Sequence, residues 1–257
     1  MLIDTHCHLD FEGLSQNLDD VIQRALDADV KRMITISTHV HKLDRLLEIT
    51  QTYDQVFCSV GTHPNYAHEE QNITAEDLIQ LSKHPKIVAF GEVGLDYHYD
   101  YSSPKEQKKT FQEHIIASRE TQLPLVIHSR NADIDMEQIL REQTKEGTFP
   151  FILHCYSSGM QLARAGLELG GYISFSGILT FKNALEIREI AKIVPYQHLL
   201  IETDAPFLAP VPHRGKINEP SFVRYTAALL AETIGLTIEE TAQITTENAL
   251  RLFSKMK

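Results

Sequence analysis

The chain opens with Leu2-Ile3-Asp4-Thr5-His6-Cys7-His8-Leu9-Asp10, an apolar run that carries two histidines one residue apart. Alternate side chains of a β-strand point to the same face of the strand. His6 and His8 can therefore direct two neutral imidazoles at one metal ion. A His-x-His pair also occurs in proteins that bind no metal, so this pair needs support from the rest of the chain.

Further metal-binding side chains stand at the downstream ends of four other strand-like segments. They are Glu92, His128, His154 and Asp204. In a parallel barrel the carboxyl ends of the strands open onto one face, where active sites form. We therefore expect the six side chains to meet there and to hold two divalent ions, with Glu92 as the bridging carboxylate.

Apolar, β-branched segments alternate with amphipathic segments along the chain. The expected strands cover residues 2–6, 32–37, 56–63, 87–96, 123–129, 151–156, 172–177 and 198–204. The helices expected between them cover residues 18–28, 41–51, 75–83, 105–121, 134–145, 160–169 and 185–193. Eight strand-helix units of roughly 25 to 30 residues each are typical of a (β/α)8 TIM barrel.

The segment after the last expected strand predicts additions to this barrel. A proline-rich loop over 205–212 leads into two more expected helices, 220–234 and 238–254. Thr237 and Glu240 have the spacing of a capping box for the second of these helices. Because no linker or low-complexity tract interrupts the pattern, we expect a single domain over residues 1–257.

Composition narrows the class of protein. The formal net charge of −11 argues against a general nucleic-acid coat protein, because nonspecific affinity for phosphate requires a basic surface. No apolar run reaches the roughly 18 residues of a membrane span, and no leader pattern opens the chain. We expect a cytoplasmic protein without a membrane partner or an obligate protein partner. The three cysteines are expected to be buried, and His39, His41 and His68 to be solvated at the surface.

Other side chains near the strand ends indicate contacts with a substrate or with the ligands. Arg130 follows the fifth strand and Arg214 lies in the loop after the eighth, so two cations are expected to face substrate phosphate. His63 and Asn65 close the third strand and are further candidates for substrate contact. Asp96 and Glu202 share faces with Glu92 and Asp204, so we expect them to hydrogen-bond to metal ligands. Surface salt bridges to Glu219 or Asp100 are the alternative role for each arginine.

The chain resembles the TatD family of metal-dependent deoxyribonucleases over its whole length. The resemblance is carried by residues 3–10, Gly61-Thr62-His63-Pro64, Gly91-Glu92-Val93-Gly94-Leu95-Asp96-Tyr97, 124–130, Glu202-Thr203-Asp204-Ala205-Pro206, 214–220 and 246–253. It implies a metallo-barrel of the amidohydrolase type, a pair of divalent ions, and hydrolysis of DNA from the 3′ end. The family's ligand positions fall on His6, His8, Glu92, His128, His154 and Asp204.

The sequence therefore predicts a metal-dependent hydrolase that cleaves phosphodiester bonds at the ends of single-stranded DNA. Glu92 and Asp204 are the expected catalytic residues, with Asp204 as both a ligand and a proton acceptor. Zinc, manganese and magnesium all suit this mixture of ligands. Two alternatives stay open at this point. One is an amide or ester hydrolase, for example on aminoacyl-tRNA, and the other is a binding protein without catalysis.

Overall fold

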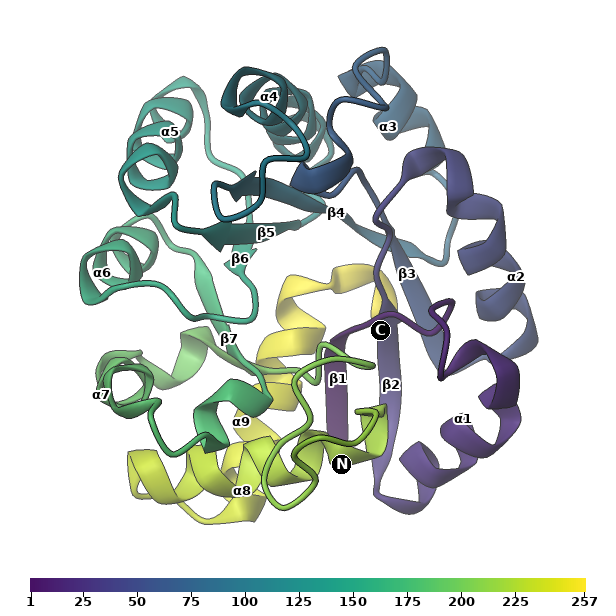
Figure 1. Cartoon of the computed structure of the whole chain (residues 1–257), viewed down its shortest axis with the longest axis vertical. Helices are drawn as coiled ribbons and strands as arrows, with labels where there is room; N and C mark the ends of the chain where they lie inside the picture. Colours follow the sequence, from purple (N-terminus) through teal and green to yellow (C-terminus); the bar gives the residue numbers. More distant parts are fainter.

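The computed structural model describes residues 1–257 and contains one eight-stranded sheet. Its parallel strands are hydrogen-bonded in chain order and curve into a nearly closed barrel (Figure 1). They are β1 (Leu2–Cys7), β2 (Val30–Thr35), β3 (Val56–Val60), β4 (Ile87–Asp96), β5 (Leu125–Arg130), β6 (Phe151–Leu153), β7 (Tyr172–Phe175) and β8 (Leu199–Ile201). The predicted TIM barrel is confirmed, although β3, β6 and β8 end earlier than the apolar runs suggested.

Helices surround the barrel in the alternating order that the sequence predicted (Figure 1). They are α1 (Leu18–Asp27), α2 (Leu43–Thr52), α3 (Ala75–Leu81), α4 (Pro104–Thr121), α5 (Asp133–Glu146), α6 (Met160–Glu168), α7 (Leu185–Ile193), α8 (Val223–Ile234) and α9 (Ile238–Leu252). The capping box of Thr237 and Glu240 at the start of α9 is confirmed. None of these helices combines the length and the apolar character that a membrane-spanning helix needs.

The seam between β8 and β1 closes through contacts at the carboxyl ends of these strands. The backbone N–H of Asp204 donates to the carbonyl oxygen of His6 over 2.8 Å. Below this contact, the carboxylate of Asp4 accepts hydrogen bonds from the backbone N–H of Thr203 at 2.9 Å and from its hydroxyl at 2.6 Å. The seam thus fixes the histidines of β1 beside Asp204.

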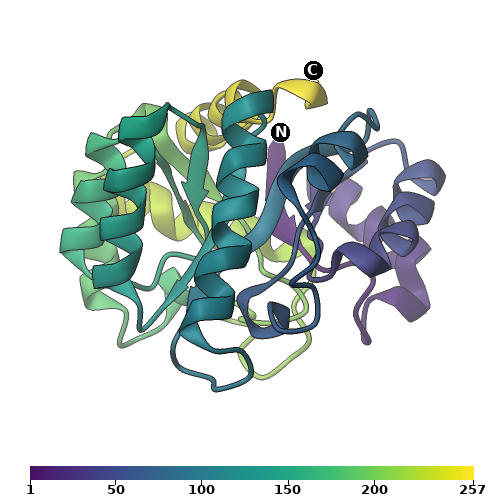
Figure 2. The same cartoon turned by 90° about the horizontal axis from the view of Figure 1, so that it is seen from above.

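The opposite end of the barrel is sealed by the C-terminal helix. Figure 2 shows both termini at one end of the barrel and the long loops at the other. Apolar side chains of the barrel interior form one cluster with α9 and the turn that follows it. Its members are Ile3, Ile34, Ile36, Val88, Ala89, Val126, Ile152, Leu200, Ala249, Leu252, Phe253 and Met256. With its base filled, the barrel offers only its mouth to a ligand.

Two expectations about burial need correction. His39 was expected at the surface but is only 7% exposed, because its ring packs 3.9 Å from the ring of Tyr66. That prediction was wrong, whereas His41 and His68 are exposed as expected. Cys155 is partly exposed rather than buried, and the other two cysteines are buried.

Candidate metal centre

Glu92 reaches the barrel mouth from an irregular point in β4. The pairing register between β4 and β5 shifts between Phe90 and Val93, which marks a β-bulge around Glu92. A bulge redirects a side chain that regular pleating would place elsewhere. Gly91 makes this approach possible, because its φ is +114° and a Cβ there would lie 2.6 Å from the carbonyl oxygen of Val126. The glycine therefore lets the bulge pack against β5.

The two ligand candidates at the seam between β8 and β1, His6 and Asp204, also stand at irregular points of the backbone. β1 shifts its register between Asp4 and Cys7, the interval that contains His6. Asp204 has a φ of +57°, in the left-handed region that aspartate tolerates better than most residues. These local departures from regular strand geometry all lie where side chains converge.

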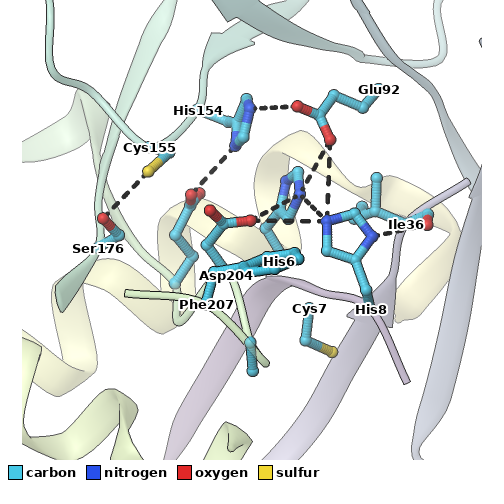
Figure 3. A network of polar contacts seen from close by, with 12 residues as sticks. His6, Cys7, His8, Ile36, Glu92, His154, Cys155, Ser176, Asp204 and Phe207 are labelled. Atoms are coloured by element: carbon cyan, nitrogen blue, oxygen red, sulfur yellow. Dashed lines mark hydrogen bonds and ion pairs between the residues drawn. The ribbon is translucent and has the colours of Figure 1, made fainter. Parts of the chain in front are cut away.

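The carboxylate of Glu92 lies between two groups of histidine nitrogens, and Figure 3 shows it between His154 on one side and His6 and His8 on the other. Its Oε1 is 2.8 Å from Nε2 of His154 and 2.9 Å from Nδ1 of His128. Its Oε2 is 3.4 Å from Nε2 of His6 and 3.9 Å from Nε2 of His8. The two oxygens of one carboxylate therefore face different groups of histidines, as a bridging ligand requires.

Asp204 joins His6 and His8 in one group of possible metal ligands. Its Oδ1 lies 3.5 Å from Nε2 of both His6 and His8, and those two nitrogens are 3.3 Å apart. A tetrahedral zinc ion with bonds near 2.0 to 2.1 Å separates its ligand atoms by about 3.3 to 3.4 Å. The spacing of these donor atoms fits a single ion between them.

Hydrogen bonds on the far side of the rings determine which nitrogens can bind a metal. Nδ1 of His8 is 3.2 Å from the carbonyl oxygen of Ile36 and must donate, because a carbonyl only accepts. Nδ1 of His154 is 3.2 Å from Oε1 of Glu202 and donates in the same way. Nε2 of each neutral ring then presents a lone pair. Nε2 of His154 is buried without a hydrogen-bond partner although Glu92 is close, which fits two ligand atoms that share a cation.

The electrostatics of the cluster favour added positive charge. Burial opposes a charged imidazole, but Glu92 and Glu202 outweigh it and hold the pKa of His154 well above its ordinary value. Burial would likewise raise the pKa of Glu92, yet His154 and its neighbours hold that pKa well below the usual range. Asp96 lies 3.1 Å from Nε2 of His128 and supplies that ring with an outer carboxylate. Protons or metal ions must balance these carboxylates, and the lone pairs suit metal ions.

His63 lies beside the cluster, but its ring is suited to donate a hydrogen bond rather than to bind a metal ion. Its Nδ1 accepts a hydrogen bond of 3.1 Å from the backbone N–H of Asn65, so its Nε2 carries the proton. That Nε2 lies 3.5 Å from Oε1 of Glu92. Burial lowers the pKa of His63 to about 3, which keeps the ring neutral. His63 is therefore suited to donate to a bound molecule rather than to ligate an ion.

A cavity of about 650 Å³ leads from the mouth to this cluster. His63, Asn65 and Arg130 line it together with five of the six predicted ligands, while His6 lies deeper in the barrel. Its walls also contain the aromatic residues Phe11, Tyr66, Tyr99 and Phe207. The sequence analysis did not predict these aromatic residues as part of the site. Their positions in loops after strands, which lie at the barrel mouth, could have indicated it.

Arg214 is the predicted substrate contact that the structure does not bring to this cavity. Its guanidinium carbon lies 3.6 Å from the centre of the Phe181 ring, and the residue is absent from the cavity lining. Glu219, a suggested salt-bridge partner, pairs instead with Arg24 over 2.6 Å. Arg214 instead stacks on an apolar ring, a contact that sequence spacing does not reveal, and this explains why it does not line the cavity as predicted.

A barrel whose mouth gathers four histidines and two carboxylates around converging lone pairs has the architecture of a metal-dependent hydrolase. The chain belongs to the TatD family, since the family model described as TatD related DNase matches residues 3–254.

Individual relatives agree with this assignment. The chain is 43% identical to the uncharacterized metal-dependent hydrolase YabD of Bacillus subtilis, over 98% of this chain and 99% of that protein. It is 30% identical to a protein of Salmonella typhimurium named 3′-5′ ssDNA/RNA exonuclease TatD, over 98% of both chains. The crystal structure of YJJV, a TatD homologue of Escherichia coli, superposes with a TM-score of 0.91 at 29% identity, covering 98% of both chains.

Proposed function

We propose that the protein is a metal-dependent phosphodiesterase that removes nucleotides from the 3′ end of single-stranded DNA. The position of Glu92 between two groups of nitrogen donors carries this proposal. A carboxylate placed between two sets of donor atoms would let the chain hold two divalent ions, and a pair of such ions would suit hydrolysis at phosphorus. The name of the Salmonella relative gives independent support for an exonuclease on single strands.

The proposed ligands divide into two groups around Glu92. His6, His8 and Asp204 would hold one ion, and His128 and His154 would hold the other. Divalent ions supply Lewis acidity, which makes water more acidic and neutralises phosphate charge. Zinc, manganese and magnesium are all compatible with this set of nitrogen and oxygen donors.

The protein's own residues would bind the phosphate and move a proton. Burial is outweighed by His8 and His6, so the pKa of Asp204 lies below its ordinary value and its carboxylate is available to accept a proton from water. The Nε2 proton of His63 faces the cavity as a neutral donor for a phosphate oxygen. Arg130, the one Lys or Arg side chain in the cavity lining, would hold the charge of a neighbouring phosphate of the strand rather than that of the scissile one.

The size and charge of the cavity support a strand end as the substrate. A volume of about 650 Å³ lies within the range of pockets for single small ligands, about 300 to 1,000 Å³. A protein of net charge −11 with one arginine at the cavity has few contacts for a duplex backbone. An unpaired end also avoids the unstacking cost of a few kcal/mol that an extruded base requires.

A panel of substrates tests the proposal. The purified protein would be given end-labelled linear single strands, circular single strands, duplex DNA, RNA and aminoacyl-tRNA, with each metal in turn and with chelator. We expect metal-dependent shortening of the linear strand from its 3′ end, while the circle stays intact. The Glu92→Gln variant, purified in parallel, controls for contaminating nucleases.

Other outcomes of the panel would contradict this function. Efficient cleavage of the circle would indicate an endonuclease. Hydrolysis of the aminoacyl ester without cleavage of any nucleic-acid strand would indicate a carbonyl hydrolase, since the same ligand set can serve an ester or an amide. A protein that binds metal and cleaves none of these substrates would point to the binding role.

A further inference from the structure

A second cavity of about 700 Å³ adjoins the metal cavity. The two cavities share Ser129, Arg130 and Ser157 as lining residues, so they meet at these three residues. The remaining walls of the second cavity come from Tyr97 after β4 and from residues 131–135 and 158–159, in the loops after β5 and β6 and at the start of α5. None of the residues that belong to the second cavity alone is a proposed ligand.

We propose that this second cavity binds one further nucleotide of a single strand whose end lies in the metal cavity. The inference rests on the proposed phosphodiesterase function and extends it. In this arrangement the scissile phosphate lies at the metal centre, the next phosphate along the strand lies at Arg130, and the nucleoside beyond it enters the second cavity. The enzyme then favours ends of three or more nucleotides over a dinucleotide.

The junction between the cavities has groups that suit a phosphate. The guanidinium of Arg130 lies over the ring of Tyr99, with its carbon 5.0 Å from the ring centre. Stacking on the ring fixes the guanidinium plane and leaves the N–H groups at its edge available for phosphate oxygens. The hydroxyl of Ser129, at the same junction, is buried and has no hydrogen-bond partner in the protein. A bound phosphate would supply acceptors for both groups.

The second cavity itself suits a base and a sugar rather than another phosphate. Its carboxylates already have partners, since Asp135 pairs with Lys108 over 2.7 Å and Asp133 accepts from the backbone N–H of Gly159 over 2.9 Å. They would still repel a second anion placed deeper in the cavity. The uncharged groups there, including the hydroxyl of Ser158, can donate to and accept from base edges and sugar oxygens. One phosphate at the junction is therefore the arrangement that the charges allow.

The inference is tested by filling the second cavity and comparing two substrates. Ser158→Trp adds a large ring to the wall of this cavity outside the metal cavity. The substrates are a thymidine dinucleotide with one phosphodiester and a single-stranded thymidine pentanucleotide, and the measurement is kcat/KM for the first cleavage. We expect the ratio of pentanucleotide to dinucleotide to fall at least about tenfold, the effect of losing about 1.4 kcal/mol of binding. Thr52→Trp, on the exposed surface of α2, adds the same bulk elsewhere and should keep the wild-type ratio.

A second variant keeps the test independent of how Ser158→Trp folds. Arg130→Gln should reduce the slope of log affinity against log salt for the pentanucleotide by about 0.7, the value of one single-strand phosphate contact, and leave the dinucleotide slope unchanged. An unchanged ratio in a folded Ser158→Trp variant, or equal slope changes for both substrates in Arg130→Gln, would overturn the second cavity as a nucleotide site. Failure of the wild-type protein on both substrates would instead overturn the phosphodiesterase function, and this inference with it.

Discussion

The two ends of the barrel satisfy their polar groups in opposite ways. At the base, apolar side chains of the C-terminal segment fill the barrel interior. The ammonium of Lys255 donates hydrogen bonds to the carbonyl oxygens of Ser82 at 2.5 Å, Ile87 at 3.1 Å and His84 at 3.3 Å. Three acceptors match the three donors of an ammonium group. The Lys255 ammonium is therefore fully paired within the chain.

At the mouth, buried polar atoms lack such partners. The hydroxyl of Ser129 and Oδ1 of Asn65 are buried without hydrogen bonds in the protein, and Nε2 of His154 has only its 2.8 Å contact with Glu92. An unsatisfied buried polar group costs about 1 to 3 kcal/mol, so folding alone does not account for these positions. The base therefore stabilises the fold, while the mouth is organised around a ligand that the chain does not contain. The following substitutions separate these two roles.

The largest effect is expected for Glu92→Gln at the mouth. The substitution keeps the shape of the side chain but removes the charge that both histidine groups share. Loss of an outer partner of a ligand typically costs about 10- to 100-fold in affinity or activity, so loss of the bridging ligand should exceed about 100-fold. Turnover by the purified variant and its bound metal, determined by elemental analysis, measure this effect. Wild-type turnover with a full metal content would contradict the bridging role.

Phe253→Ala at the base should lower the stability of the fold but leave metal binding and turnover unchanged. The fully buried ring packs in the barrel interior, and its removal should lower the free energy of unfolding by about 3 to 5 kcal/mol. Urea denaturation measures the loss. Metal content and turnover per folded molecule should stay near wild type, because the substitution lies at the end opposite the metal centre. A variant of normal stability that had lost its metal would erase the distinction between the two ends.

Glu202→Gln is expected to have an intermediate effect, confined to the mouth. The carboxylate of Glu202 orients His154 through a 3.2 Å contact, so its loss should weaken metal affinity about 10- to 100-fold without removing a ligand. Metal titration of the chelator-treated protein measures the change. Excess metal should restore most of the turnover, which it should not do for Glu92→Gln. Glu239→Gln, exposed at the start of α9, is the matched control, and equal losses in the two variants would assign Glu202 no special role.

The sequence could predict those features of the molecule that depend on repeating patterns. The period of two in strands and the common direction of parallel strands were enough to place His6 and Asp204 at one mouth. The pattern could not reveal the bulge around Glu92, because that depends on how closely Gly91 packs against the neighbouring strand. It also could not place Arg214, whose position depends on stacking against a ring 33 residues away in the chain (214 minus 181). Contacts between distant segments decide these details.

The smallest effect is expected for Lys255→Met at the base, with Lys257→Met at the exposed terminus as its control. Methionine preserves much of the apolar stem but leaves three carbonyl oxygens without their donor. Because these contacts are only partly buried, water can replace part of them, and the total loss in the free energy of unfolding should be about 1 to 3 kcal/mol. Burial lowers the pKa of Lys255, so the unfolded chain binds more protons at this group in alkaline solution. Wild-type stability therefore gains a small increment as the pH rises from the lowered pKa towards the ordinary value of 10.5, and the methionine variant lacks it. Urea denaturation of both variants and wild type at neutral and alkaline pH measures this difference. A loss of metal affinity in Lys255→Met, with stability unchanged, would mean that the base contributes to the metal site and that the two ends are not independent.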